Sequence, residues 1–172
     1  MALAFAALCL GPARADRLES DSVGLAVSPT QSAMPRLGVK APQNAALAGD
    51  VVRLLNLART ERGLTPLKLH GTLTRIAVER STEMERLGYA RDSATAQIQN
   101  SAIAADLAGE NLFTARDLES TRLAHAVLEV WLNSERHRSN LLDPRATHVG
   151  LAVLQFSDRF LVNAFFVGQL DR

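Results

Sequence analysis

The residues of this chain whose types could support chemistry gather in two stretches. The first is GENL at 109–112, which contains Glu110. The second is WLNSERHRSNLL at 131–142, in which His137 lies between two arginines. Glutamate and histidine are common choices for proton transfer. We expect the two stretches to form the loops before and after one helix, so their spacing in the sequence does not by itself bring Glu110 and His137 together.

The sequence can be tested against two kinds of hydrolytic site. A serine hydrolase needs a serine beside a histidine. Ser134 is the only local candidate near His137, and no G-x-S-x-G motif is present. A glycosidase needs two facing carboxylates. Asp92 and Glu110 are available for this, but nothing in the sequence indicates that they face each other.

Composition and charge exclude some classes of protein. Of the 172 residues, 47% are hydrophobic and 22% are charged, and the formal net charge is +1. These values are ordinary for a globular protein. No basic stripe is present, so we expect no nucleic-acid partner. No apolar run approaches 20 residues, so we expect no membrane span.

The N-terminus has the pattern of a secretory signal peptide. An apolar segment at 2–10 is followed by Ala-Arg-Ala at 13–15, although no Lys or Arg precedes the apolar segment. We therefore predict a signal peptide at 1–15 and a secreted or periplasmic mature protein. The only cysteine, Cys9, lies in the predicted signal peptide. The mature chain would then have no disulfide and no cysteine-based metal site.

The next segment has the composition of a disordered linker. Residues 16–47 contain three prolines and several serines, lack aromatic residues, and show no helical or strand period. We therefore assign 16–47 to a linker and 48–172 to the folded domain.

Apolar residues three and four apart predict three helices in this domain. The first begins with Asp50 as its capping residue and ends at Gly63. The second runs from about 72 to 87, and the third starts near Asp117. A further short helix is expected around 95–106.

The C-terminal part has the pattern of a β-hairpin. The runs THVGLAVLQF and RFLVNAFFVGQL are separated by the two residues Ser157 and Asp158. Both runs are apolar on both faces, so the hairpin needs cover on both faces. This predicts the α+β class, as a three-layer α-β-α sandwich with a small antiparallel sheet covered by helices on both faces.

Three stretches in this order resemble the CAP superfamily of cysteine-rich secretory proteins, antigen 5 and pathogenesis-related 1, and within it the cysteine-poor bacterial SCP-like extracellular domain. They are LLNLARTERGLTPLKL at 54–69, GENL at 109–112, and WLNSERHRSNLLDPRATHVGLAV at 131–153. The resemblance covers roughly 48–170. It implies an α-β-α sandwich, in agreement with the strand pattern.

The resemblance also implies a site. In the family, the glutamate of GEN and the histidine of the third stretch face one cleft, which carries over to Glu110 and His137. Many members add a second histidine after a Gly-Tyr pair, and two histidines can hold a divalent metal. Here Asp92 stands about where that histidine would be. One histidine with carboxylates is a poor zinc site, so we expect no metal and no cofactor.

Each of these residues also has a structural interpretation. Glu110 could cap the third-helix region or bind backbone N–H groups, and His137 could bind a carbonyl to fix its loop. If the two side chains interact, the carboxylate should raise the pKa of His137, whereas burial would lower it. The residues expected to line the cleft are Glu110, His137, Asp92, Asn111, Ser134 and Asn140.

Two functional hypotheses follow. We favour an exported, non-enzymatic binding module, whose ligand is a small hydrophobic molecule or a lipid, glycan or peptide of the cell envelope. The alternative is a hydrolase that uses Glu110 and His137 as acid and base. The sequence does not specify an oligomeric state.

Overall fold

The computed structural model describes residues 43–87, 98, 103, 105, 108–156 and 158–168. The predicted signal peptide, nearly all of the predicted linker, Asp92 and most of the helix expected at 95–106 lie outside these residues. Within the described part, no helix is long and apolar enough to cross a membrane. The elements are α1 (Ala45–Thr60), β1 (Lys68–Leu69), α2 (Gly71–Leu87), β2 (Ala108–Arg116), α4 (Ser120–Asn133), α5 (Glu135–Leu141), β3 (His148–Gln155) and β4 (Arg159–Val167).

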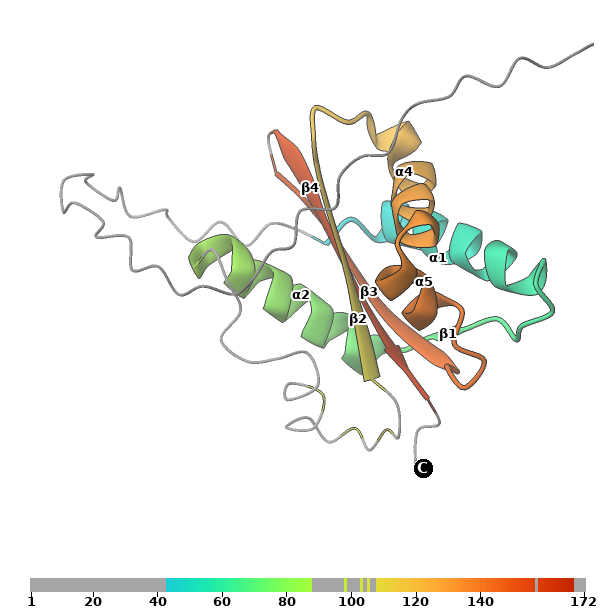
Figure 1. Ribbon diagram of the computed structural model, residues 1–172. Helices are drawn as coiled ribbons and strands as arrows, with labels where there is room; N and C mark the ends of the chain where they lie inside the picture. Colours follow the sequence, from blue (N-terminus) through green and yellow to red (C-terminus); the bar gives the residue numbers. More distant parts are fainter. Residues whose placement is uncertain are drawn as a thin grey trace, which may run out of the picture. The chain divides into compact units, whose positions relative to one another are not determined.

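The strands form one sheet between two layers of helices. The strand order is β1-β3-β4-β2, and β2 and β4 as well as β3 and β4 are antiparallel. The two-residue strand β1 pairs parallel to β3, which makes the sheet mixed. Helix α2 lies on one face of the sheet, and α1, α4 and α5 lie on the other (Figure 1). The predicted α-β-α sandwich is therefore confirmed, with one short parallel strand added to it.

Strands β3 and β4 are buried on both faces, as their apolar pattern predicted. Alternate residues of each strand pack against α1 and α4, and the intervening residues pack against α2. The first core includes Val51, Leu55, Leu123, Val127, Trp131, Leu151 and Val162. The second core includes Leu73, Ile76, Ala77, Ala152, Phe165 and Val167.

Helix α1 begins earlier than the sequence pattern indicated. Asn44 caps the helix, because its Oδ1 accepts a hydrogen bond from the backbone N of Leu47 at 3.1 Å. The predicted cap, Asp50, lies inside α1, as does the predicted domain start at residue 48. Gly63 follows the helix with a φ of 72°, a left-handed conformation that glycine adopts at little cost.

The two chemistry-bearing stretches are regular elements, so their prediction as loops was wrong. GENL lies in β2, which pairs with β4 along its full length from Ala108 to Arg116. Glycine, glutamate and asparagine are poor strand formers, so this strand depends on its partner and not on local preference. His137 lies in α5, a separate short helix that starts after Ser134.

A buried arginine joins α1 to the segment after α5. Arg59 is fully buried, and its guanidinium donates to the carbonyl oxygens of Thr65, Leu141, Asp143 and Ala146 at 2.8–3.1 Å. Burial lowers the pKa of Arg59, while Asp143 opposes this shift. Four carbonyl partners let the fold keep this charge in its interior.

Gly150 sets the distance between α2 and the sheet. A Cβ at this position would overlap the backbone carbonyl group and Cβ of Leu73 in the first turn of α2. We expect Gly150→Ala to lower the free energy of unfolding by about 1–3 kcal/mol, because a helix backbone would have to move. The matched control is Gly49→Ala at an exposed position of α1, where nothing lies within 4 Å of the added Cβ. It should raise stability by about 0.5–1 kcal/mol. Urea unfolding measures both changes, and equal effects would contradict this assignment.

Candidate functional site

The carboxylate of Glu110 is held by an arginine from the helix above it. Glu110 lies on β2, and its side chain points to the face covered by α2. Arg80 donates from Nε and Nη2 to the two carboxylate oxygens at 2.5 and 3.0 Å. Asn163 of β4 donates from Nδ2 to Oε1 at 3.0 Å. Both oxygens of Glu110 are therefore occupied by donors.

Arg80 needs this partner because it lies on the buried side of α2. Together with Leu73, Ile76 and Ala77, it occupies the stripe that faces the sheet, and it is only 8% exposed. A charge on a buried stripe is stable only when it is paired and hydrogen-bonded. Arg80 thus fixes Glu110. The position of Arg80 on an apolar helical stripe is the sequence feature that could have indicated a buried acidic partner.

Asn111 points to the opposite face and binds α5. Its Nδ2 donates to the carbonyl oxygen of His137, and its Oδ1 accepts from Nδ2 of Asn140, both at 2.9 Å. Nδ2 of Asn140 also lies 3.2 Å from the carbonyl oxygen of Glu110. Gly109 leaves room for this contact, since a Cβ there would lie 2.6 Å from Oδ1 of Asn140.

The last residue of the motif contacts α4 through its backbone. The indole Nε1 of Trp131 donates to the carbonyl oxygen of Leu112 at 3.2 Å. Trp131 is fully buried in the core. The four residues of GENL therefore contact three helices, which are α2, α4 and α5.

The imidazole of His137 does not share a hydrogen bond or an ion pair with Glu110 in the described part of the chain. Its Nδ1 is buried without a partner there. Burial first, and then the positive charge of Arg136, lower the pKa of His137. The expectation that Glu110 would raise this pKa was wrong, because the carboxylate lies with Arg80 on the other face of β2.

Of the two further predicted cleft residues, Ser134 lies in the described part of the chain and Asp92 does not. Ser134 is the N-cap residue of α5, and its side chain makes no capping hydrogen bond. Its carbonyl oxygen accepts from the backbone N of Arg138 at 2.8 Å. Asp92 lies outside the described residues. The structure thus joins Asn111 and Asn140 to the backbones of Glu110 and His137, but it does not join the side chains of Glu110 and His137.

The remaining histidines are His70, His125 and His148. The rings of His70 and His148 lie 5.9 Å apart in an edge-to-face arrangement. Burial, His70 and Lys68 together lower the pKa of His148. His125 is exposed on α4. Among the described residues, no three His, Cys, Asp or Glu side chains could hold a metal ion together.

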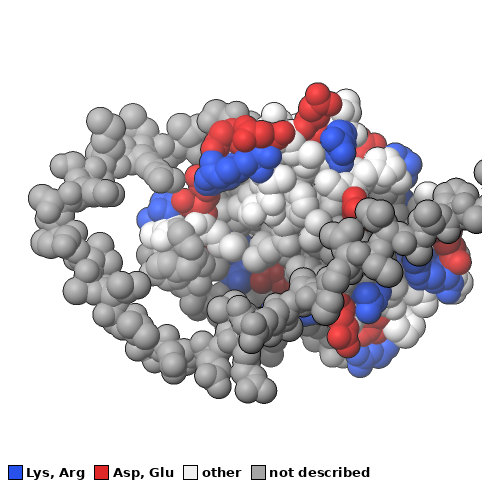
Figure 2. All heavy atoms as spheres, turned by 45° about the horizontal axis from the view of Figure 1, so that its top comes forward, with Lys and Arg blue, Asp and Glu red and all other residues white. Residues whose placement is uncertain are grey.

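Charges of both signs share the surface. On the face shown in Figure 2, lysines and arginines lie among aspartates and glutamates, with no broad patch of one sign among the coloured residues. An extended nucleic-acid footprint is a basic stripe, and the coloured residues of this face form none.

The Arg80–Glu110 pair can be tested by a double-mutant cycle. Arg80→Met and Glu110→Gln should each lower the free energy of unfolding by about 3–5 kcal/mol, because each leaves a sheltered charge without its partner. The double variant should lose clearly less than the sum. The control is the exposed pair Arg75 and Glu79 on the same helix, where each change should cost roughly 0.5 kcal/mol or less. Urea unfolding measures all variants.

His137 supplies the comparison for this cycle. Glu110→Gln and His137→Ala should be additive in the same assay, since their side chains share no contact. Coupling of Glu110 to His137, together with additivity toward Arg80, would contradict the arrangement.

Protonation of His137 should weaken the fold. Because its pKa is lower in the folded than in the unfolded state, the unfolded chain binds the proton first as pH falls. Stability is therefore complete above the unfolded-state value of 6.5 and is lost as pH falls through the folded-state pKa. His137→Gln should show a shallower loss between neutral pH and about pH 4.5 in urea unfolding. Part of the loss of stability should remain in this variant, because the pKa of His148 is lowered as well.

Asp143 also affects the pH dependence of stability, but it titrates at lower pH than the range of this experiment. The hydrogen bond from Arg145 is the largest cause that holds the pKa of Asp143 below 3.8. The stability that Asp143 contributes is therefore present above pH 3.8 and is lost only at lower pH. If the free energy of unfolding of His137→Gln falls with pH as steeply as that of the parent chain above pH 3.8, His137 does not titrate differently in the folded state.

Comparison with known proteins agrees with the resemblance found in the sequence. The profile of the Cysteine-rich secretory protein family, CAP, matches residues 52–170. The chain is 31% identical over 111 residues to the uncharacterized protein YkwD of Bacillus subtilis, which covers 61% of this chain and 41% of that protein.

Two solved structures are similar in fold. A cysteine-rich secretory protein from Staphylococcus aureus has a TM-score of 0.62 and 22% identity. The match covers 74% of this chain and 40% of that protein's chain. An extracellular protein with an SCP domain from Bacillus anthracis has a TM-score of 0.54 and 27% identity, and covers 73% and 41%. The chain spans about two fifths of the length of each of these three relatives. The family profile matches more than half of the chain, so the chain belongs to the cysteine-rich secretory protein (CAP) family.

Proposed function

We propose that this chain is an extracytoplasmic CAP domain that binds a component of the cell envelope and does not catalyse a reaction at Glu110. The observation that carries the proposal is the occupied carboxylate: Arg80 and Asn163 donate to both of its oxygens. A general acid or base must reach the proton it transfers, and a carboxylate held in this way is poorly placed to do so.

His137 is the proposed contact to the ligand. Its imidazole is half-buried, and burial keeps the ring neutral by lowering its pKa. A neutral imidazole offers one donor and one acceptor. Asn111 and Asn140 fix the helix that presents it. We further assign Ser134, at the start of α5, and Asp92 to the ligand-binding cleft that the sequence predicts around His137.

The extracytoplasmic location has two supports. The first is the signal-peptide pattern at 1–15. The second is the description of the Bacillus anthracis relative as an extracellular protein. The proposed ligand is a lipid, glycan or peptide of the envelope, or another small hydrophobic molecule.

Binding and turnover can be measured together. The full chain should bind at least one of two probes, purified muropeptides or vesicles of envelope lipids, in calorimetry, and mass spectrometry should find each probe unchanged. His137→Ala should weaken binding while the fold is retained, whereas His125→Ala on the exposed face of α4 should bind like the parent chain. Product formation that disappears in both Glu110→Gln and His137→Ala would establish the alternative hydrolase, and absence of binding to both probes would contradict the binding module.

A further inference from the structure

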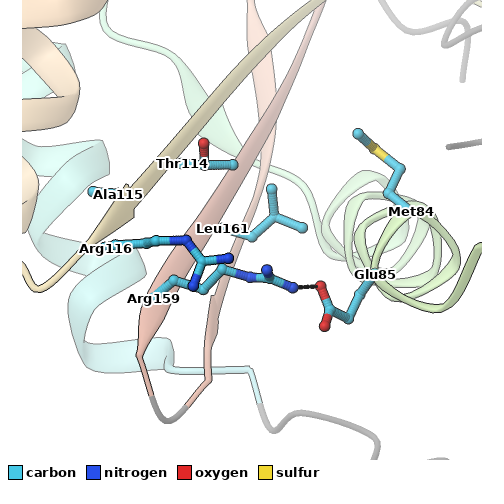
Figure 3. Close-up of a pocket in the computed structure, with 7 residues that line it drawn as sticks. All are labelled: Met84, Glu85, Thr114, Ala115, Arg116, Arg159 and Leu161. Carbon is cyan, nitrogen blue, oxygen red and sulfur yellow. Dashed lines mark hydrogen bonds and ion pairs between the residues drawn. The ribbon is translucent and has the colours of Figure 1, made fainter. Parts of the chain in front are cut away.

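A pocket of about 500 Å³ lies one helical turn beyond Arg80 along the seam between α2 and the sheet. It opens between the last turns of α2, the end of β2 and the start of β4 (Figure 3). This volume is within the range of small-molecule sites. The lining residues are Met84, Glu85, Thr114, Ala115, Arg116, Arg159 and Leu161.

Two arginines lie directly opposite each other at one end of this pocket. Arg116 of β2 is the register partner of Arg159 of β4, and Thr114 is the partner of Leu161. Figure 3 shows both guanidinium groups at the same end, with Leu161 and Thr114 farther along the strands and Met84 across from them on α2. Like charges directly opposite on neighbouring strands destabilise a sheet. The pair therefore requires negative charge nearby.

Each arginine has a carboxylate, but the two carboxylates differ in exposure. Arg159 pairs with Glu85 of α2, and both side chains are 24% exposed. Arg159 also lies over the ring of Phe156, 5.2 Å from its centroid. Arg116 pairs with Asp158 of the hairpin turn, where the side chains are 61% and 51% exposed. An exposed ion pair contributes little to stability, so Asp158 can be exchanged for another anion at small cost.

We infer that this pocket binds a small carboxylate ligand with a compact aliphatic group, whose carboxylate replaces Asp158 on Arg116. The guanidinium fork matches the two oxygens of a carboxylate. Thr114 adds a hydroxyl, and Leu161 and Met84 supply apolar surface for the aliphatic group.

Charge balance selects a monoanion. Arg116 and Arg159 are balanced by Glu85 and Asp158. A ligand carboxylate that takes the place of Asp158 keeps one carboxylate on each arginine and adds only one negative charge. A dianionic phosphate would add a charge close to Glu85, which costs energy. The inference is independent of the proposed function, because the pocket contains neither Glu110 nor His137.

The test uses N-acetyl-leucine and its uncharged counterpart N-acetyl-leucinamide as probes of the full chain. Titration followed by NMR should give saturable shifts of the backbone amides of 114–116 and 159–161 with the acid, at millimolar concentrations. The amide should give none at these positions, because it lacks the charge that Arg116 recognises.

Two variants should move the affinity in opposite directions. Arg116→Gln should weaken binding of N-acetyl-leucine about tenfold or more, because the charged fork is lost. Asp158→Asn should tighten it severalfold, since it removes the competing carboxylate. Both positions are exposed, so both variants should keep the parent spectrum elsewhere. Arg122→Gln, at an exposed position on α4, is the matched control and should leave the affinity unchanged.

Four outcomes would overturn the assignment. They are binding of the amide as tight as that of the acid, weaker binding in Asp158→Asn, tighter binding of isobutyl phosphate than of N-acetyl-leucine, and no saturable shift at the pocket residues. None of these outcomes bears on His137, so they leave the proposed function unaffected.

Discussion

Neighbouring side chains of a β-strand point to opposite faces of the sheet, and the fold depends on this constraint at β2. Glu110 points to α2 and binds Arg80, whereas Asn111 points to α5 and binds the carbonyl oxygen of His137. One short motif therefore connects both helical layers to the edge strand. It also follows that Glu110 and His137 belong to different layers, although their backbones are joined through Asn111 and Asn140.

The position of α5 has a second determinant on its other side. Arg59 of α1 binds the carbonyl oxygens of Leu141, Asp143 and Ala146, which include the last residue of α5 and the segment that leads into β3. Carbonyl groups at a helix C-terminus carry partial negative charge, which favours a cation there. The five donors of a guanidinium can reach several carbonyls at once, while an ammonium offers only three. The interaction holds the helix of His137 between α1 and the sheet.

The layers of the fold could be predicted because they depend on apolar pattern. Strands β3 and β4 are apolar on both faces, and that alone required helices on both sides. Strand β2 could not be predicted in this way. Its residues Gly109, Glu110 and Asn111 disfavour strands, and only the long-range pairing with β4 makes the segment extended.

The site was harder to predict than the fold for a related reason. An ion pair between Arg80 and Glu110, thirty positions apart, leaves no period in the sequence. The resemblance identified Glu110 and His137 as site residues, but it did not indicate which side chain would neutralise the glutamate. For His137, burial and the positive charge of Arg136 both lower the pKa, and only the structure shows how far the ring is buried.

Burial decides what each arginine–carboxylate pair along the seam of α2, β2 and β4 can do. The side chains of Arg80 and Glu110 are 9% and 14% exposed, and both carboxylate oxygens of Glu110 are bound, so separating the pair would leave a charge in a poorly hydrated place. Arg116, at the far end of β2, and Asp158 of the hairpin turn are more than half exposed, and water can replace either partner. The same chemistry thus gives a fixed connection between layers at one end and an exchangeable contact at the other. A glutamate and an arginine in a cleft are therefore not sufficient signs of reactivity, since the sheltered pair is too stable to exchange and the exposed pair is suited to exchange its anion.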